Sequence, residues 1–146
     1  SRRNFWNNML IEVNKVCDLY KNISPTRDHW LSAGSGMSSV RYTAVVTRSY
    51  VRVELTIAGK SMDDNKNIFD LLHDKRNDIE TTFGAPLEWE RLDDKKMSRI
   101  KFEKTGVSIF NEDDWEIMIQ FLADSFPKFE KAFKSHLNQV NRLMKN

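Results

Sequence analysis

Two neighbouring runs of alternating apolar and polar residues constrain the fold more than any other feature of the chain. In residues 40–46 and 51–57 every second residue is apolar, and arginine, threonine and glutamate lie between, with Val45 as the one apolar exception. A side-chain period of two is typical of β-strands. Only a short polar break near Arg48 and Ser49 separates the runs. The pattern therefore predicts an antiparallel hairpin with one buried face.

Three other segments have the period of a helix. Residues 5–22 place apolar side chains at steps of three and four, and so do residues 61–83 and 111–144. Gly84 follows the second segment, as expected of a helix stop. The third segment contains Pro127, which we expect to kink it because proline removes a backbone donor. Its far end is expected to extend past the sheet with an apolar stripe exposed.

A second hairpin is predicted over residues 87–92 and 98–103, with its turn at 93–96. Residues 24–39 are expected to form a loop, in which the run Ser32–Gly36 makes a tight turn before the first strand. The predicted fold is α+β: a four-stranded antiparallel sheet of two hairpins packed against helices, in the order α-ββ-α-ββ-α with a long C-terminal helix. We expect residues 1–146 to form one such domain.

Composition excludes several classes of protein. The 146 residues carry 23 basic and 21 acidic side chains, a net charge of +2, which argues against a strongly basic nucleic-acid coat protein. The single cysteine, Cys17, forms no internal disulfide and no zinc site by itself. No apolar run approaches the roughly 18 residues of a membrane span. We therefore expect a cytoplasmic protein with no membrane partner.

No residue pattern indicates a catalytic site, a metal site or a cofactor site. The three histidines are far apart, and none has a second ligand three or four residues away. Acidic-x-Lys occurs at 64–66, 93–95 and 94–96, but at a helix start or a turn rather than on a strand. The sequence therefore favours a protein that is not an enzyme, with no catalytic residue, metal or cofactor. A small metal-dependent nuclease or hydrolase is kept as an alternative.

The candidate binding residues lie on the predicted sheet and in its second turn. Arginines and lysines that point away from the core could hold phosphates. Glutamates occupy the same strands, however, and cross-strand ion pairing is the ordinary interpretation of that mixture. The candidates are Arg41, Arg52, Glu54, Arg91, Lys95, Lys96, Arg99 and Lys101.

Several short motifs, spread from end to end, suggest a family. They are Phe5-Trp6, residues 30–36, Arg52–Leu55, Asn65-Lys66 with Ile68-Phe69, Phe83-Gly84, residues 86–95 and 98–100, Gly106–Ser108 and Trp115. In this order they resemble the bacterial and archaeal domain of unknown function family 4268. The resemblance implies that such domains occur alone or at the C-terminal end of longer proteins, after a PD-(D/E)XK nuclease-like region. The resemblance implies no catalytic residues for this sequence. The absence of an initial methionine is compatible with such a C-terminal module.

These observations lead to a functional expectation. We expect a non-enzymatic accessory or binding domain linked to nuclease-type or DNA-associated bacterial systems. Its partners would be nucleic acid, or a nuclease-like domain in the same or a neighbouring chain. A charged network of Arg52, Glu54, Arg91 and Arg99 could serve as the contact surface or could be structural. The alternative is a homodimerisation or protein-interaction module that uses the C-terminal helix.

Overall fold

The computed structural model describes residues 1–145, which form five strands and four α-helices. The elements, in chain order, are α1 (Arg2–Asn14), β1 (Trp30–Gly34), β2 (Val40–Val46), β3 (Tyr50–Ile57), α2 (Met62–His73), α3 (Arg76–Phe83), β4 (Glu88–Glu90), β5 (Ser98–Thr105), a 3-10 turn η1 (Glu112–Asp114) and α4 (Trp115–Lys145). No helix of these residues is both long enough and apolar enough to cross a bilayer.

All five strands form one antiparallel sheet in the order β1-β2-β3-β5-β4. The expected α+β class, the antiparallel sheet and the long C-terminal helix are confirmed, but the expectation of four strands is wrong. The additional strand, β1, pairs along its whole length with β2, from Trp30 opposite Val45 to Gly34 opposite Arg41. Its alternating burial, with Leu31 and Ala33 inward, is the ordinary pattern of a strand with one buried face.

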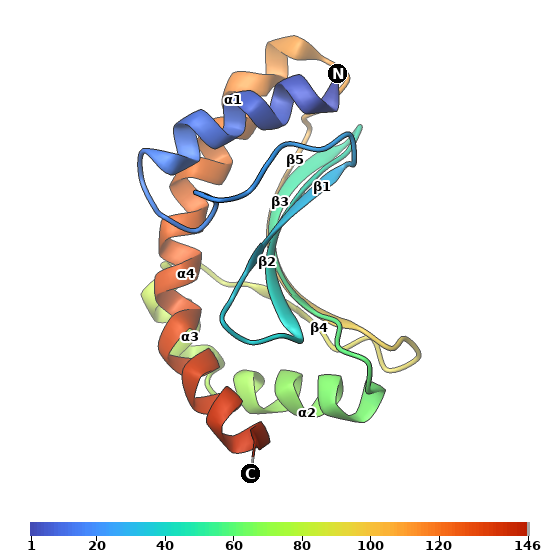
Figure 1. The fold of residues 1–146 in the computed structure, drawn as a ribbon, viewed down its shortest axis with the longest axis vertical. Helices are drawn as coiled ribbons and strands as arrows, with labels where there is room; N and C mark the ends of the chain where they lie inside the picture. Colours follow the sequence, from blue (N-terminus) through green and yellow to red (C-terminus); the bar gives the residue numbers. More distant parts are fainter. Residues whose placement is uncertain (146) are drawn as a thin grey trace.

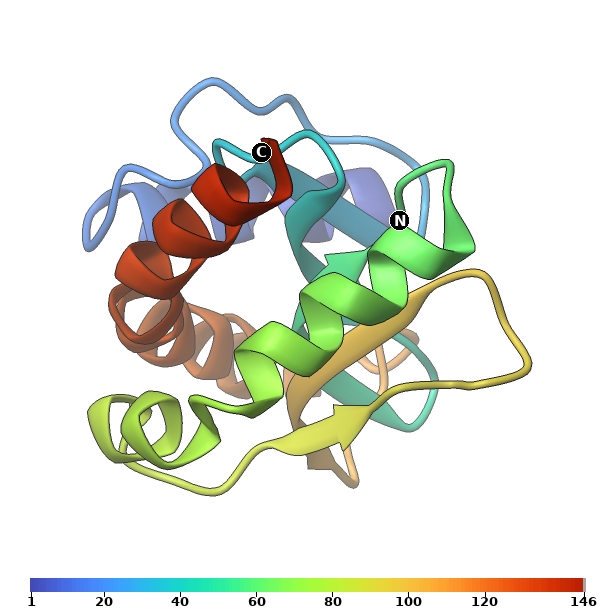
Figure 2. The same ribbon diagram turned by 90° about the horizontal axis from the view of Figure 1, so that it is seen from below.

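Helices α1, α3 and α4 lie on one side of the sheet (Figure 1), and no helix within residues 1–145 covers the opposite side. The sheet is curved, with its concave side facing away from α4. The core is between the sheet and the helices, where β3 contributes Val51, Val53, Leu55 and Ile57, all fully buried. Figure 2 shows α2 crossing one end of the sheet. We call the helix-free side of the sheet the outer face.

The predicted helix over residues 61–83 is two helices. Ser61 caps α2, since its Oγ accepts from the backbone N–H of Asp64, and Gly84 ends α3 in a left-handed conformation with φ 96°. Between them the chain turns at Asp74 and Lys75. The apolar period runs on through this turn, so the sequence pattern conceals it. The turn lets α2 pack against β3 and β5 while α3 lies along α4.

The C-terminal helix continues through Pro127 without an interruption. It is bowed around the sheet in Figure 1, and its inner face is buried from Met118 to Val140. Its second half packs against α2 and α3, and Phe133 lies beside Trp89 with ring centroids 6.4 Å apart. The apolar stripe that we expected to extend past the sheet is therefore covered at Leu137 and Val140 by the chain itself.

Candidate binding site

Strand register brings polar residues from all five strands into rows across the outer face. In the central row, Thr43 pairs with Glu54, and Glu54 with Lys101. Because side chains of alternate residues share a face, the rows two residues away lie on the outer face as well. Both contain charged residues, and one also contains Trp30 and Val45. The rows, read from β1 to β4, are Trp30–Val45–Arg52–Glu103, Ser32–Thr43–Glu54–Lys101–Glu88 and Gly34–Arg41–Thr56–Arg99–Glu90.

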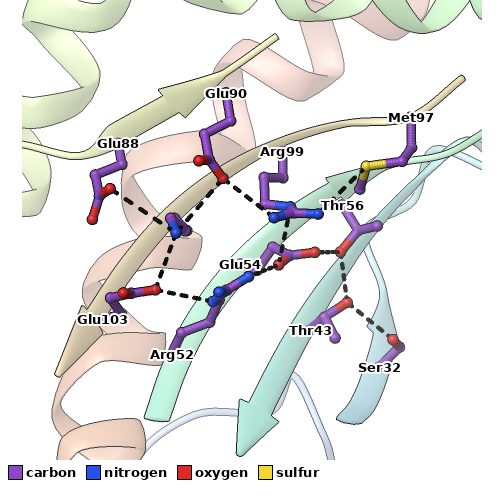
Figure 3. A network of polar contacts seen from close by, with 11 residues as sticks. Ser32, Thr43, Arg52, Glu54, Thr56, Glu88, Glu90, Met97, Arg99 and Glu103 are labelled. Atoms are coloured by element: carbon purple, nitrogen blue, oxygen red, sulfur yellow. Dashed lines mark hydrogen bonds and ion pairs between the residues drawn. The ribbon is translucent and has the colours of Figure 1, made fainter. Parts of the chain in front are cut away.

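Glu54 is the centre of a network of ion pairs on this face (Figure 3). Its Oε1 lies 3.0 Å from Nη1 of Arg52 and 3.7 Å from Nε of Arg99. Arg52 also approaches Glu103, with 3.2 Å between Nε and Oε1. Arg99 donates from Nη1 to Glu90 over 3.3 Å. The carboxylate of Glu54 is thus shared between two guanidinium groups.

Lys101 extends the network toward β4. Its Nζ lies 3.2 Å from Glu103 and 3.6 Å from Glu90. Five of the predicted site residues, Arg41, Arg52, Glu54, Arg99 and Lys101, therefore share the outer face, where the positive charges are matched by Glu54, Glu88, Glu90 and Glu103. This balance makes the face a poor surface for tracking a phosphate backbone, which needs an excess of positive charge.

The central charges are unusually buried for a face with no helix on it. Arg52 is 7% exposed and Glu54 is 6% exposed. Three buried atoms of the network make ion-pair contacts of 3.2 to 3.7 Å but no hydrogen bond in the described part of the chain: Nε of Arg52, Nε of Arg99 and Oε1 of Glu103. Their charges are compensated, whereas their hydrogen-bonding capacity is only partly used.

A chain of hydroxyl groups runs from β1 to the same carboxylate. Thr56 donates to Oε2 of Glu54 over 2.6 Å, and 2.9 Å separates each of the pairs Thr43–Thr56 and Ser32–Thr43. A hydroxyl has one proton, so the direction of the whole chain follows from its last bond. Thr43 donates to Thr56, and Ser32 donates to Thr43. The Ser32 end therefore presents only acceptor capacity to a ligand.

The outer face is hollowed beside this chain, and the hollow has a volume of about 380 Å³. Its aromatic side is formed by His29, Trp30 and Tyr50; Trp30 is 44% exposed and meets the His29 ring edge-on at 4.8 Å. Arg52 lies over the Tyr50 ring at 4.4 Å. The lining consists of His29, Trp30, Ser32, Thr43, Val45, Tyr50, Arg52, Glu54, Thr56 and Arg99. We call it the outer-face hollow.

The other three predicted site residues lie elsewhere, in the loop between β4 and β5. Arg91 makes a two-pronged contact with Asp70 of α2, at 2.9 and 3.0 Å, and also pairs with Asp93. The hydrogen bonds from Arg91 lower the pKa of the Asp70 carboxyl. Lys95 and Lys96 are exposed in the same loop. Our hypothesis that Arg91 shares a network with Arg52, Glu54 and Arg99 is therefore wrong.

Lys66 of α2 holds this loop in place. Its Nζ donates to the carbonyls of Arg91, Leu92 and Met97 at 2.6, 2.8 and 2.8 Å. Burial lowers the pKa of Lys66 from its ordinary value. Leu92 adopts a φ of 56°, which is uncommon for a residue other than glycine. The acidic-x-Lys motif at 64–66 thus ends in a lysine whose ammonium group is committed to the backbone.

The network does not have the form of a catalytic or metal site. Glu54 is compensated by two guanidinium groups, which compete with any cation for its oxygens. In residues 1–145 no group of three or more histidine, cysteine or acidic side chains is placed to hold a metal ion. Asp93 and Asp94 are exposed in the loop. The arrangement is suited to hydrogen bonding rather than to activating water.

A second and larger hollow, of about 540 Å³, opens beside the start of α1. Arg2, Arg3 and Arg27 line it together with Phe110, and all four are exposed. No ion pair within the described residues orders these arginines. We therefore place the candidate site at the outer-face hollow, where the charged groups are already held in position.

The sequence analysis missed the aromatic side and the hydroxyl chain of the outer-face hollow. His29, Trp30 and Ser32 belong to the segment, residues 24–39, that was expected to be a loop. The alternation of Leu31 and Ala33 with Trp30, Ser32 and Gly34 is the signal that could have identified the strand.

Comparison with known proteins gives one match. A family model described as "Domain of unknown function (DUF4268)" matches residues 1–137. No curated protein and no solved structure matches the chain.

Proposed function

The chain belongs to the DUF4268 family, as its sequence motifs indicated, and from this premise we propose that it is a non-enzymatic binding domain whose binding surface is the outer face of the sheet. The family description assigns no function, so the proposal rests on the geometry of the outer-face hollow.

One observation carries the proposal: charged side chains are buried and positioned on a sheet face that no helix of residues 1–145 covers. Arg52 and Glu54 are each less than a tenth exposed, and ion pairs to Glu103 and Arg99 hold them in place. Arg99 is more exposed, and within the described chain its Nη2 is directed only at the sulfur of Met97, so it keeps donor capacity toward the hollow. Pre-positioned polar groups beside an apolar wall are typical of ligand sites.

The chemistry of Glu54 favours binding over catalysis. A general base or a metal ligand needs free lone pairs, whereas Glu54 accepts from Arg52 and Thr56 and lies beside Arg99. We propose that this carboxylate orients the guanidinium groups. A preparation that cleaves nucleic acid in the presence of magnesium, and loses that activity in Glu54→Gln, would contradict the non-enzymatic assignment.

For its biological setting we propose a nuclease-type or DNA-associated system of the bacterial cytoplasm, because the family resemblance suggests a nuclease-like region in longer relatives. The complete reading frame tests this part, and an upstream region without nuclease character would count against it. Homodimerisation through α4 stays a prediction, although the covered stripe removes the observation that motivated it. Sedimentation at high concentration measures it directly.

The binding surface can be tested with signals that the chain already contains. The indole N–H groups of Trp6, Trp89 and Trp115 donate to internal acceptors, and Trp30 lies in the hollow. Duplex DNA, single-stranded DNA, RNA and a chemically diverse fragment set are titrated at low salt while the four indole resonances are followed. We expect at least one ligand class to shift the Trp30 resonance and leave the other three in place.

A matched pair of variants completes the test. Trp30→Ala should abolish the binding, and Arg76→Gln, which removes an exposed charge on α3, should leave it unchanged. Binding that survives Trp30→Ala, or a complete absence of binding across the panel, would refute the outer face as the binding surface.

A further inference from the structure

We infer that the outer-face hollow accepts one nucleotide unit, with the base beside Trp30, the sugar near Ser32 and Thr43, and the phosphate at Arg52 and Arg99. This inference rests on the proposed function, because it names the ligand class of the same site. It follows from the order in which three kinds of side chain occur across the hollow.

The first zone is aromatic. Trp30, which is 44% exposed, lines the hollow, and His29 and Tyr50 line the same side. A planar ring can stack on such a surface, and base–aromatic stacking is tolerant of which base is present. An aliphatic ligand would make less contact with the flat indole ring than a planar ring does. The aromatic zone therefore favours a planar ring system.

The second zone offers acceptors. Because the hydroxyl chain runs from Ser32 to Glu54, its protons are all directed along the chain, and Ser32 Oγ retains free lone pairs. A ligand group next to Ser32 must therefore donate. A sugar hydroxyl or a base N–H has this property, whereas a phosphate oxygen does not.

The third zone offers donors. Nε of Arg52 and Nε of Arg99 contact Glu103 and Glu54 without making a hydrogen bond. Among the described residues Arg99 directs Nη2 only at the sulfur of Met97, 3.8 Å away, so this nitrogen is the donor that a ligand can use. The charged groups that line the hollow are these two guanidinium groups and Glu54, an excess of one positive charge. Glu90 and Glu103 face the same arginines from β4 and β5 and reduce that excess. The zone suits a single phosphate group rather than a run of phosphates.

The spacing of the zones excludes smaller ligands. Trp30 and Arg52 lie in one row but two strands apart, so their backbones are separated by about 10 Å. Inorganic phosphate or a small aromatic acid reaches only one of the two ends. A nucleoside monophosphate has a ring at one end, hydroxyls in the middle and an oxyanion at the other, and a hollow of about 380 Å³ is within the usual range for small-molecule sites.

Four probes test the inference by the Trp30 indole resonance and by calorimetry: uridine 5′-monophosphate, uridine, inorganic phosphate and indole-3-acetate. We expect the monophosphate to shift the Trp30 resonance and to bind at least about tenfold more tightly than uridine, the gain expected of one charge-assisted contact. Inorganic phosphate should leave the Trp30 resonance in place. A short oligothymidylate shows whether the natural ligand is a single strand or a free nucleotide. If it binds more tightly per site than the monophosphate, the ligand is a single strand; if it binds more weakly, the ligand is a free nucleotide.

The variants test the contacts to the two ends of the ligand separately. Arg99→Gln should weaken monophosphate binding about tenfold without changing uridine binding, and Trp30→Ala should weaken both. Arg99 is chosen because it is more exposed than Arg52, so its loss disturbs the fold less; circular dichroism verifies folding. Arg76→Gln is the charge-matched control.

The two possible failures give different results. If indole-3-acetate or another ligand class shifts the Trp30 resonance and no nucleotide does, the nucleotide inference is wrong while the outer face remains a binding surface. If nucleotides bind and shift only the other indoles, the nucleotide class holds for some other surface, and both the inference and the proposed surface are refuted.

Discussion

Replacing Lys66 with methionine tests how the loop between β4 and β5 is held. The substitution keeps an unbranched side chain and removes the ammonium group that donates to the carbonyls of Arg91, Leu92 and Met97. Arg91 O retains a second donor, the hydroxyl of Ser98 at 2.7 Å. Leu92 O likewise retains the backbone N–H of Lys95, at 2.9 Å, so Met97 O is the carbonyl that loses the donor the structure gives it.

The expected cost follows from this one group. A partly buried acceptor that loses its donor costs about 1–1.5 kcal/mol, because water reaches it only in part, so Lys66→Met should lower the free energy of unfolding by about 1–1.5 kcal/mol. For a urea slope of about 2 kcal/mol per M, the midpoint should fall by about 0.5–0.75 M. Relief of the buried ammonium's desolvation acts in the opposite direction and makes the upper figure a bound.

Urea unfolding followed by tryptophan fluorescence measures this difference. Lys96→Met is the matched control, since Lys96 is exposed in the same loop and only its backbone carbonyl is used, by Asn65. Amide exchange should also increase in residues 91–97 of Lys66→Met. If Lys66→Met and Lys96→Met have midpoints that agree within about 0.3 M, Lys66 does not hold the loop and the reasoning fails.

Three further predictions concern stability. Tyr20→Phe removes a fully buried hydroxyl that donates to Leu31 O at 2.7 Å and should cost about 1–2 kcal/mol in a thermal or urea melt; an unchanged melt would refute this. Gly84→Ala places a side chain on a residue with φ 96° and should lower the free energy of unfolding by about 1 kcal/mol. Gly34 has no positive φ and free space where a Cβ would lie, so Gly34→Ala should lower it by less than about 0.5 kcal/mol. Because the folded-state pKa of the Asp70 carboxyl is lowered, the wild-type protein should be more stable than Asp70→Asn at a pH above the ordinary pKa of 3.8. This difference in unfolding free energy should be lost as the pH falls through the lowered pKa. A difference that persists at still lower pH would contradict the ion pair with Arg91.

Local patterns predicted much of the fold. The period of two over residues 40–57 identified β2 and β3, and the stops at Gly84 and Asn111 are where helices end and begin. Strand β1 was missed because the glycine and serine residues at 34–36 resemble a turn, and its alternation covers only five residues. The separation of α2 from α3 depends on tertiary packing, because both contact α4 but α2 also contacts β3 and β5. No local pattern records these contacts.

The candidate site was predicted less completely, for a reason of geometry. Residues on strands keep a fixed side and spacing, so Arg52, Glu54 and Arg99 could be placed together from the sequence. Arg91 lies just past a strand of only three residues, where the chain leaves the sheet and turns toward Asp70 of α2. Which residues meet there depends on contacts between segments about 20 residues apart along the chain, and alternation carries no information about them.

The pairing of β3 with β5 joins the N-terminal three strands to the C-terminal hairpin, and the charges along it discourage misalignment. In the observed register Arg52 faces Glu103 and Glu54 faces Lys101. A slip of two residues in one direction would place Arg52 against Lys101, and in the other would place Glu54 against Glu103. A slip of one residue would turn the apolar side chains of β3 toward water. The same ion pairs that shape the outer-face hollow thus give the two halves of the sheet a single way to align.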